Sequence, residues 1–336
     1  MGFQVALLDG PEGPDAVEEL VLARVGADIV RARPNVPGEI ERIVANADAI
    51  LCDATSVTAD LLDLAVKVQI ISEYGIGYDN IDVAAASQRG IWVSNVPGFC
   101  AEEVANHTLA LILAASRRLI ALDRSTRNGE WDPVGVARGA TRLSTQSLGL
   151  IGFGQIGRRV ARRAGAFGMK VLVYSPNTTD AIAREYGAVR TDVATIFEQS
   201  DYVSLHLPSM PSTRDLIDAS TLERFKPSAW LINTSRGSLV DESALLAALR
   251  AGRLAGAALD VRRSEPTAGP DPFRDLANVI LTPHAAFYTE QSLHELRERA
   301  AENVAAVLAG GTPHDPVNPS IKPRFDGSDR EPSMWV

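Results

Sequence analysis

The sequence is poor in cysteine and in long apolar runs, and these shortages exclude several classes of protein. It has only two cysteines, Cys52 and Cys100, with no CxxC pair or Cys/His cluster, so neither a disulfide framework nor a metal site is expected. The longest apolar helical stretch, 108–115, is too short to span a membrane. The N-terminal FQVALLDG is typical of a buried strand rather than a leader, and we expect a cytoplasmic protein with no membrane partner.

A basic excess is also missing. The chain has 33 Lys and Arg against 42 Asp and Glu, a net charge of −9 at pH 7, whereas a nucleic-acid surface needs positive charge. We therefore expect no nucleic-acid partner. A hydrophobic content of 46% with 22% charged residues is typical of a globular protein, and 336 residues suggest two domains.

Strand-like and helix-like segments alternate along the chain. The first five apolar runs are 5–9, 28–32, 49–53, 68–72 and 91–95, and six more follow from about 145 to 283. A long amphipathic segment, 101–122, separates the two sets, and a helical segment, 289–309, follows the second. This alternation predicts parallel sheets with helices on their faces.

The most informative motif is the glycine-rich turn GFGQIG at 152–157. The apolar run 148–151 leads into it, a helical pattern follows, and a second apolar run lies at 170–174. Strand, glycine turn, helix and strand in this order are the context that makes the motif a dinucleotide-binding unit.

Each glycine of this turn has a distinct physical task. Gly152 permits a tight turn, Gly154 lets a pyrophosphate approach the backbone, and Gly157 allows close packing of helix on strand. The helix that begins at Gln155 and Ile156 offers main-chain N–H groups and its positive dipole end to the phosphates.

The strand after the glycine turn ends on Ser175, where an acidic residue would bind the ribose 2′-hydroxyl of NAD. Ser175 can donate one hydrogen bond but does not repel a 2′-phosphate. Neutral residues follow at 176–179, and the nearest basic candidates are Arg158 and Arg184. We therefore expect use of NAD or NADP, with NAD slightly favoured.

Polar residues follow the ends of the later strands, where open α/β sheets bind ligands. Arg236, Glu265 and His284 each lie a few residues beyond an apolar run. A guanidinium can hold a carboxylate through two parallel hydrogen bonds. An imidazole can deliver a proton, and a neighbouring carboxylate raises its pKa and fixes its tautomer. This combination is what hydride transfer to a 2-oxo acid requires.

With these residues in place, the sequence resembles the D-isomer-specific 2-hydroxyacid dehydrogenase family, in the branch that contains phosphoglycerate dehydrogenases and C-terminal-binding proteins. The resemblance extends over nearly the whole chain except the tail. The stretches that carry it are YGIGYDNID (74–82), NVPGFCAEEVANHTLALIL (95–113), GFGQIG (152–157), NTSRGSLVDE (233–242), AALDVRRSEP (257–266) and TPHAAFYTEQS (282–292).

The resemblance implies an α/β fold of two Rossmann-like or flavodoxin-like lobes, each an open parallel sheet with helices on both faces, and an active-site cleft between them. A discontinuous substrate lobe would comprise 1–97 and 290–320, and an NAD(P)-binding lobe 98–289. The segment 321–336 would be a flexible tail. Relatives are commonly homodimers, so we expect a homodimer.

The resemblance also implies roles for single residues. Arg236 would bind the carboxylate and carbonyl of a small 2-oxo acid, and His284, paired with Glu265, would be the acid in reduction and the base in oxidation. Asp260 would contact the nicotinamide amide, and His206, Thr234 and Ser235 would line the cofactor. The main chain at Ile76 and Gly77 would hold the substrate carboxylate, and Phe287 would close over the substrate.

One departure from the family bears on substrate choice. Many relatives have an arginine at the position of Glu73, where it meets a substrate carboxylate. An acidic group there would repel a second anion, so we expect phosphorylated and dicarboxylic substrates to be poor.

Some readings stay open. The same fold would suit an NADH-sensing, corepressor-like scaffold with little catalysis, or a dehydrogenase for another hydride donor such as formate, although the latter pairs its histidine with Gln rather than with Glu265. His206 is equally compatible with packing and with a cofactor contact. For His107, packing of its helix is the favoured interpretation.

Overall fold

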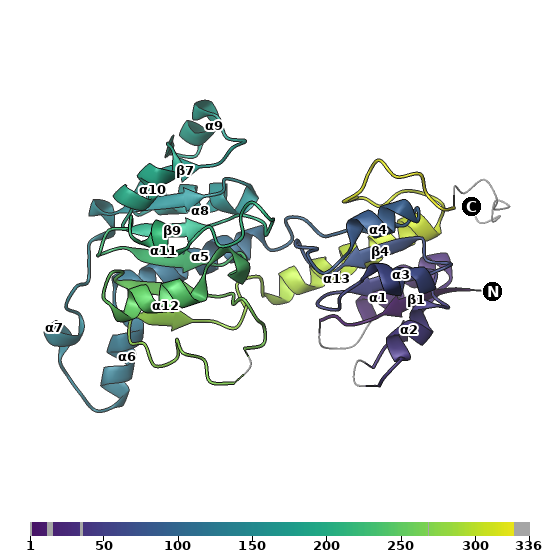
Figure 1. Ribbon diagram of the computed structural model, residues 1–336, viewed down its shortest axis with the longest axis horizontal. Helices are drawn as coiled ribbons and strands as arrows, with labels where there is room; N and C mark the ends of the chain where they lie inside the picture. The colour runs from purple at the N-terminus through teal and green to yellow at the C-terminus, as the bar shows by residue number, and fades with distance from the viewer. Residues whose placement is uncertain (1, 12–15, 34–35, 268, 326–336) are drawn as a thin grey trace. The chain divides into compact units, whose positions relative to one another are not determined.

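The computed structural model describes residues 2–11, 16–33, 36–267 and 269–325, and they belong to two compact units. The first unit comprises Met1–Phe99 with Thr289–Val336, and the second Cys100–Tyr288. Each unit has its own parallel sheet (Figure 1). The predicted α/β class with two open parallel sheets is confirmed.

The first unit is built on a five-stranded sheet in the order β2-β1-β3-β4-β5, the flavodoxin-like order. Its strands are β1 (Phe3–Leu7), β2 (Ala27–Arg31), β3 (Ala49–Cys52), β4 (Ile70–Glu73) and β5 (Trp92–Ser94). Its helices are α1 (Ala16–Leu22), η1 (Ala23–Val25), α2 (Glu39–Val44), α3 (Ala59–Leu64), α4 (Val83–Gln88) and α13 (Glu290–Leu308).

Apolar side chains from alternate strand positions fix how the first unit packs. Ile50 and Ile71 of the central strands are fully buried against α2, α3 and α4 in one cluster. The hydroxyl of Ser72, on the other face of the sheet, donates to the carbonyl oxygen of Ala300 in α13 at 3.0 Å. The strands are therefore covered on both faces, as a parallel sheet requires.

The chain after α13 packs against the edge of the same sheet. Pro316 forms a bridge with Ser94, and the N–H of Val317 donates to the carbonyl oxygen of Val93 at 2.8 Å. The Arg324 guanidinium donates to the carbonyl oxygen of Ala65 at 2.6 Å. The segment 321–325, which the sequence favoured as part of a flexible tail, is therefore held on the first unit, and 326–336 lie outside the described residues.

The second unit is built on a seven-stranded parallel sheet in the order β12-β11-β10-β9-β6-β7-β8. This is the dinucleotide-binding order, reversing beside β6, with one further strand. Its strands are β6 (Ser147–Ile151), β7 (Lys170–Tyr174), β8 (Ala188–Arg190), β9 (Tyr202–Leu205), β10 (Trp230–Asn233), β11 (Gly256–Leu259) and β12 (Val279–Leu281). Its helices are α5 (Ala101–Ser116), α6 (Leu119–Arg127), α7 (Pro133–Val136), η2 (Leu143–Thr145), α8 (Gln155–Ala166), α9 (Asp180–Glu185), α10 (Val193–Gln199), α11 (Ala219–Leu222), η3 (Gly237–Leu239) and α12 (Glu242–Arg250).

Two apolar clusters lie on opposite faces of this sheet. Leu231 belongs to the cluster that includes side chains of α10, α11 and α12, and its neighbour Ile232 belongs to the cluster formed with α5 and α8. Successive strand residues point to opposite faces, so one strand feeds both cores.

Two local features differ from the sequence reading. The segment 101–122 is not one helix: α5 ends at Ser116, Arg118 takes a left-handed φ of 55°, and α6 starts at Leu119. The short edge strand β8 was missed because Val189 and Arg190 are exposed and carry no apolar run.

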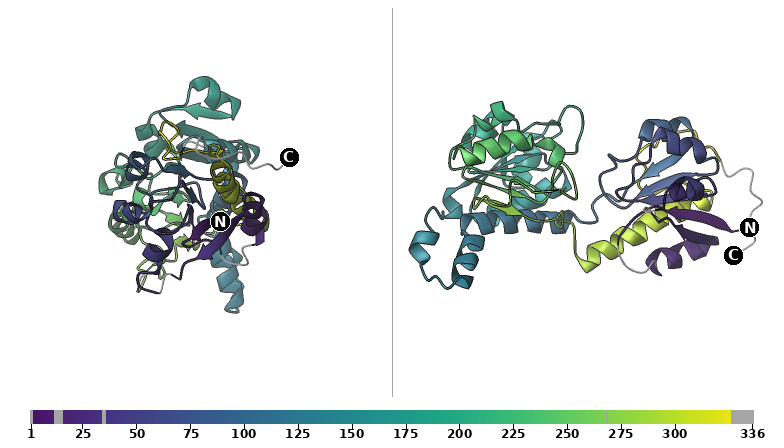
Figure 2. Two further views of the ribbon diagram at one scale, coloured as in Figure 1. Left: turned by 90° about the vertical axis from the view of Figure 1, so that its right-hand side faces the viewer. Right: turned by 60° about the horizontal axis from the view of Figure 1, so that its bottom comes forward.

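The α6–α7 arm projects from the body of the second unit (Figure 2). Among the described helices, none has the length and apolar character to cross a bilayer.

Candidate active site

Three neighbouring strands of the second sheet bring the predicted catalytic residues together. β10, β11 and β12 are consecutive in the sheet, and the loops that leave their carboxyl ends carry Arg236, Glu265 and His284 respectively. These residues are far apart in sequence, and the parallel sheet aligns them at one edge. The position matches the ligand-binding edge of open α/β sheets.

His284 and Glu265 form a short ion pair. The Nδ1 atom of His284 lies 2.5 Å from Oε2 of Glu265, with 45% and 34% of the two side chains exposed. The other carboxylate oxygen accepts the main-chain N–H of Arg262 at 2.5 Å. Glu265 is thus oriented by its own loop, and Nε2 of His284 remains on the side away from this bond.

The pair shifts the pKa of both partners. The hydrogen bond with Glu265 raises the pKa of His284, against the opposing effect of burial, and the charges of Glu265 and Asp260 raise it further while that of Arg236 lowers it. Burial alone would raise the pKa of Glu265, but its bonds with His284 and Arg262 outweigh burial, so the pKa is lowered. The imidazole is therefore biased toward the protonated form that a proton donor needs.

The loop that carries Arg236 is fixed by its own polar groups. Asn233 accepts the N–H of Ser235 at 3.1 Å and donates to the carbonyl oxygen of Arg236 at 2.9 Å. The half-buried Arg236 donates through Nη1 to the carbonyl oxygen of Ser235 at 2.8 Å. At Gly237 a Cβ atom would lie 1.9 Å from the carbonyl carbon of Arg262, so the Arg236 and Glu265 loops meet backbone to backbone.

The turn after β12 presents His284 in a left-handed conformation with a φ of 53°. The carbonyl oxygen of Asp260 accepts the N–H of His284 at 2.7 Å, and the Asp260 carboxylate accepts those of Ala285 and Ala286 at 2.9 and 3.0 Å. The Asp260 side chain is fully buried. The turn thus uses both oxygens of this carboxylate, and the contact that the sequence predicts between Asp260 and a nicotinamide amide stays a prediction.

Phe287 lies beside His284. Its ring and that of His284 are 6.1 Å apart at an interplanar angle of 82°, an edge-to-face contact, and the Tyr288 ring makes a second edge-to-face contact with Phe287. The role expected for Phe287, closing over a substrate, stays a prediction.

The glycine turn fits a dinucleotide pyrophosphate. Gly152 has a φ of 100°, and a Cβ there would lie 2.1 Å from the carbonyl oxygen of His206. A Cβ on Gly157 would lie 2.6 Å from the carbonyl oxygen of Gly152, whereas a Cβ on Gly154 meets nothing within 4 Å. The two outer glycines therefore serve packing, and the middle one leaves open space at the N-terminus of α8, where no side chain caps the helix. An anion suits that position.

Other residues predicted to line the cofactor have protein partners. Nε2 of His206 lies 3.0 Å from the Ser204 hydroxyl, and burial lowers the pKa of His206 to about 4, so it is neutral near pH 7. The hydroxyls of Thr234 and Thr108 are 3.0 Å apart, and the Ser235 hydroxyl donates to the carbonyl oxygen of Leu205 at 2.6 Å. These bonds orient the ends of β9 and β10.

Two further residues belong to the rim of the glycine turn. Ser175 follows β7, is partly exposed, and its carbonyl oxygen accepts the N–H of Thr178 at 3.2 Å. Arg158 donates to the carbonyl oxygen of Phe153 at 3.0 Å and lies over the Tyr186 ring. A cation is thus held at the turn itself.

In the first unit, the loop Gly75–Gly77 follows the carboxyl end of β4. The carbonyl oxygen of Gly75 accepts the N–H of Val96 at 2.8 Å, and that of Ile76 accepts from the Asn95 amide at 2.7 Å. The loop is partly exposed and is anchored through its carbonyl groups.

At the end of β4, Glu73 is not the charged group that the sequence predicted. Only 2% of it is exposed, and its Oε2 accepts the Cys52 thiol at 3.3 Å and the Asn80 amide at 3.1 Å. Burial raises its pKa to about 8, with a further increase from the charges of Asp53 and Asp9, although the bonds from Asn80 and Cys52 act in the opposite direction. The carboxyl is mostly protonated at neutral pH, so the predicted repulsion of a second substrate anion is corrected: the group has little charge with which to repel.

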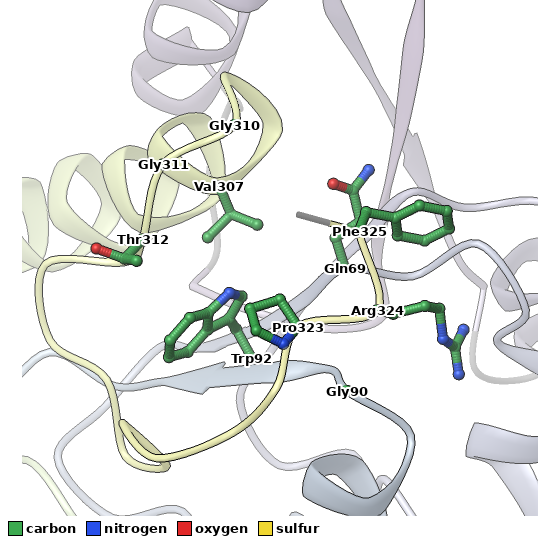
Figure 3. A pocket seen from close by; sticks show the side chains of 10 residues that line it. All are labelled: Gln69, Gly90, Trp92, Val307, Gly310, Gly311, Thr312, Pro323, Arg324 and Phe325. Carbon is green, nitrogen blue, oxygen red and sulfur yellow. The ribbon is translucent and has the colours of Figure 1, made fainter. Parts of the chain in front are cut away.

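A hollow of about 210 Å³ in the first unit lies elsewhere (Figure 3). Gln69, Trp92, Gly311, Pro323 and Phe325 contribute to its lining. Gln69 and Trp92 stand at the amino ends of β4 and β5, the opposite ends from Glu73 and Ser94. The hollow is therefore not part of the candidate active site.

Sequence reasoning missed the residues that support the site. Thr282 donates to the Asp260 carboxylate at 2.5 Å, and His107 of α5 lies 3.1 Å from the Thr282 hydroxyl. Arg262 is bonded to Glu242 at 3.0 Å while its N–H orients Glu265. The available signal was the position of these polar residues next to strand ends or on the apolar side of a helix.

Comparison with known proteins agrees with this geometry. Residues 109–286 match the D-isomer specific 2-hydroxyacid dehydrogenase, NAD binding domain. The chain is 39% identical over 295 residues to a glyoxylate reductase of Korarchaeum cryptofilum, covering 86% of this chain and 88% of the relative, and 38% identical over 296 residues to one of Thermococcus litoralis, covering 86% and 89%.

A solved structure is similar over most of its length. The D-lactate dehydrogenase of Aquifex aeolicus, complexed with NAD and lactic acid, is 30% identical with a TM-score of 0.83, covering 91% of this chain and 96% of that one. The chain belongs to the D-isomer specific 2-hydroxyacid dehydrogenase family, and it is an NAD(P)-dependent oxidoreductase that interconverts 2-oxo acids and D-2-hydroxy acids.

Proposed function

We propose that this enzyme reduces small 2-oxo acids with a single carboxylate, such as glyoxylate and hydroxypyruvate, to the D-2-hydroxy acids. The observation that carries the proposal is the short His284–Glu265 bond, formed beside the half-buried Arg236 at adjoining strand ends. Arg236 binds the substrate carboxylate and polarises the ketone, and His284 is the acid.

A bound nicotinamide would supply the hydride that the carbonyl carbon accepts. As charge develops on the carbonyl oxygen, His284 transfers its proton to that oxygen and becomes neutral, while Glu265 holds the imidazole through Nδ1 so that Nε2 is the donor. In oxidation His284 accepts the proton instead. Phe287 packs against the imidazole ring and covers the substrate.

The substrate range follows from Glu73 and the loop beside it. The main chain of Ile76 and Gly77 binds the substrate carboxylate. Glu73, whose pKa of about 8 leaves it neutral at pH 7, occupies its position without providing a positive charge for a second anion. The two similar glyoxylate reductases support a small, singly charged substrate. Phosphorylated and dicarboxylic 2-oxo acids should therefore be poor.

The cofactor preference is relaxed, with NAD slightly ahead. The open space at Gly154 and the uncapped start of α8, at Gln155 and Ile156, receive the pyrophosphate. Ser175 neither binds the ribose as a carboxylate would nor repels a 2′-phosphate. Arg158 at the glycine turn is a cation near enough to the motif to tolerate NADP.

We also propose a homodimer in a reducing cytoplasm, formed through the cofactor-binding second unit. The α6–α7 arm exposes apolar side chains, with 87% of Trp131, 77% of Val134 and 56% of Leu119 exposed. Such side chains on a projecting arm are suited to burial against a second copy. Neither described cysteine forms a disulfide and both are buried, in keeping with a reducing compartment.

The test is an oxidation screen with NADH and NADPH against glyoxylate, hydroxypyruvate, pyruvate, phosphohydroxypyruvate and 2-oxoglutarate. Turnover of the first two, lost in His284→Gln and Arg236→Leu, supports the proposal. Efficient turnover of the last two would contradict the substrate range, and a hundredfold preference for one cofactor in kcat/KM would contradict relaxed cofactor use.

A further inference from the structure

The turn that presents His284 needs external support. A φ of 53° is unfavourable for a residue with a side chain, and only three described non-glycine residues have a positive φ. The N–H groups of His284, Ala285 and Ala286 all donate to Asp260, to its carbonyl oxygen and to its two carboxylate oxygens. The conformation of the turn therefore depends on where the Asp260 carboxylate is held.

The Asp260 carboxylate is held in turn by Thr282. Its side chain is fully buried, and the Thr282 hydroxyl donates to Oδ1 at 2.5 Å. A buried carboxylate is stable only when donors surround it. The Asp260 carboxylate is therefore bonded from both ends of the same segment, by Thr282 directly after β12 and by the N–H groups of Ala285 and Ala286.

Helix α5 contributes the outermost group of this network. Nε2 of His107 lies 3.1 Å from the Thr282 hydroxyl and 3.6 Å from Oδ1 of Asp260. Thr282 has one hydroxyl hydrogen and donates it to Asp260, so it must accept the bond from His107. The hydrogen of His107 therefore lies on Nε2, and the bonds run in one direction, from His107 through Thr282 to Asp260.

We propose that His107 is a positioning residue, which acts through Thr282 and Asp260 to hold the turn that presents His284 to Glu265. The inference rests on the proposed acid–base role of His284. It replaces the packing role that the sequence favoured for His107, and it explains why an imidazole with a fixed tautomer stands in α5 at this position.

The charged groups around His284 give the inference a measurable consequence. Glu265 and Asp260 raise the pKa of His284, and Arg236 lowers it. If the donor at His107 is lost, the turn relaxes and the His284–Glu265 bond weakens. The pKa of His284 then falls toward its ordinary value, and kcat falls more than KM changes.

Two matched pairs of variants test this in the full-length protein. His107→Phe keeps a ring without an N–H and His107→Gln keeps an N–H donor; Thr282→Val removes the hydroxyl and Thr282→Ser keeps it. The pKa of His284 is measured by NMR of its ring protons, which is practical with five histidines in the chain. The His284 resonance is assigned by its disappearance in His284→Gln. His294→Gln, which removes an exposed histidine, is the control and should leave the His284 pKa unchanged.

We expect His107→Phe and Thr282→Val to lower the His284 pKa by about half a unit or more and kcat roughly tenfold, with KM changed by less than about threefold. His107→Gln and Thr282→Ser should stay within about threefold of wild type. If one apolar variant does not fold, the other pair decides.

An unchanged His284 pKa in the apolar variants, or equal losses in both members of each pair, would overturn the proposal and leave His107 with packing alone. A wild-type rate in His284→Gln would instead refute the acid–base role of His284. In that case a lowered pKa in the apolar variants would still show that the network positions the turn.

Discussion

Replacing Glu73 with glutamine should remove a pH-dependent loss of stability from the first unit. Burial raises the Glu73 pKa from 4.5 to about 8, so the folded state holds this proton more tightly than the unfolded state. The associated stabilisation is complete below pH 4.5 and is lost as the pH rises toward 8. Glutamine has no such proton, yet its amide oxygen can still accept from Cys52 and Asn80.

The size of the effect follows from the pKa difference. A shift of roughly 3.5 units at about 1.36 kcal/mol per unit gives roughly 5 kcal/mol in total, of which about 3 kcal/mol is lost by pH 7. The variant should therefore gain on the wild type steadily between pH 5 and pH 8, and the difference should level off above pH 8.

Urea unfolding between pH 5 and 9 measures this, followed in the first unit by hydrogen exchange of peptides that cover β3 and β4. Glu41→Gln, at an exposed carboxylate in α2, is the matched control and should follow the wild type. Parallel stability curves for Glu73→Gln and wild type would refute the reasoning, because they would mean that the Glu73 carboxyl ionises as easily in the folded chain as in water.

The remaining predictions concern catalysis, the cofactor and assembly. Since the bond with Glu265 raises the pKa of His284, reduction should be fast below that pKa and should decline as the pH rises through it. Glu265→Gln should move this decline to lower pH and reduce kcat about tenfold to a hundredfold. A pH–rate profile of both proteins measures this. Gly154→Ala should leave the thermal midpoint unchanged but weaken NADH binding, measured by fluorescence titration, about tenfold or more. Gly152→Ala should instead destabilise the fold by several kcal/mol, because Gly152 has a positive φ and a Cβ there would lie 2.1 Å from the carbonyl oxygen of His206. Equal effects of the two alanines would contradict the separate roles of the two glycines. Trp131→Asp should convert the proposed dimer to a monomer in light scattering, and a dimer that persists in the variant would exclude the arm as the interface.

The sequence was most informative where local chemistry and chain order determine structure. The glycine turn at 152–157 and the strand-end positions of Arg236, Glu265 and His284 could be predicted because parallel strands place their carboxyl ends at one edge of a sheet. The order of the elements was equally readable from alternating apolar runs. Only short or exposed elements such as β8 gave no such signal.

Burial was the main property that could not be predicted. From the sequence, Glu73 and Asp260 were predicted to be charged groups that ligands contact. The folded chain buries both side chains and provides their carboxylates with internal hydrogen-bond donors. The partnership of His107 with Thr282 joins positions 175 residues apart. Its geometry depends on how α5 packs on the sheet, which no local pattern of residues specifies.

The close approach at Gly237 has a consequence for how the enzyme uses binding energy. Because the backbone of Gly237 meets that of Arg262 with no room for a side chain, the loops that carry the cation and the carboxylate cannot shift independently. Their alignment is preorganised before any ligand arrives, so substrate binding energy need not be spent on ordering them and remains available for the transition state. Any larger residue at this position would push the two loops apart and so separate the Arg236 guanidinium from the Glu265 carboxylate.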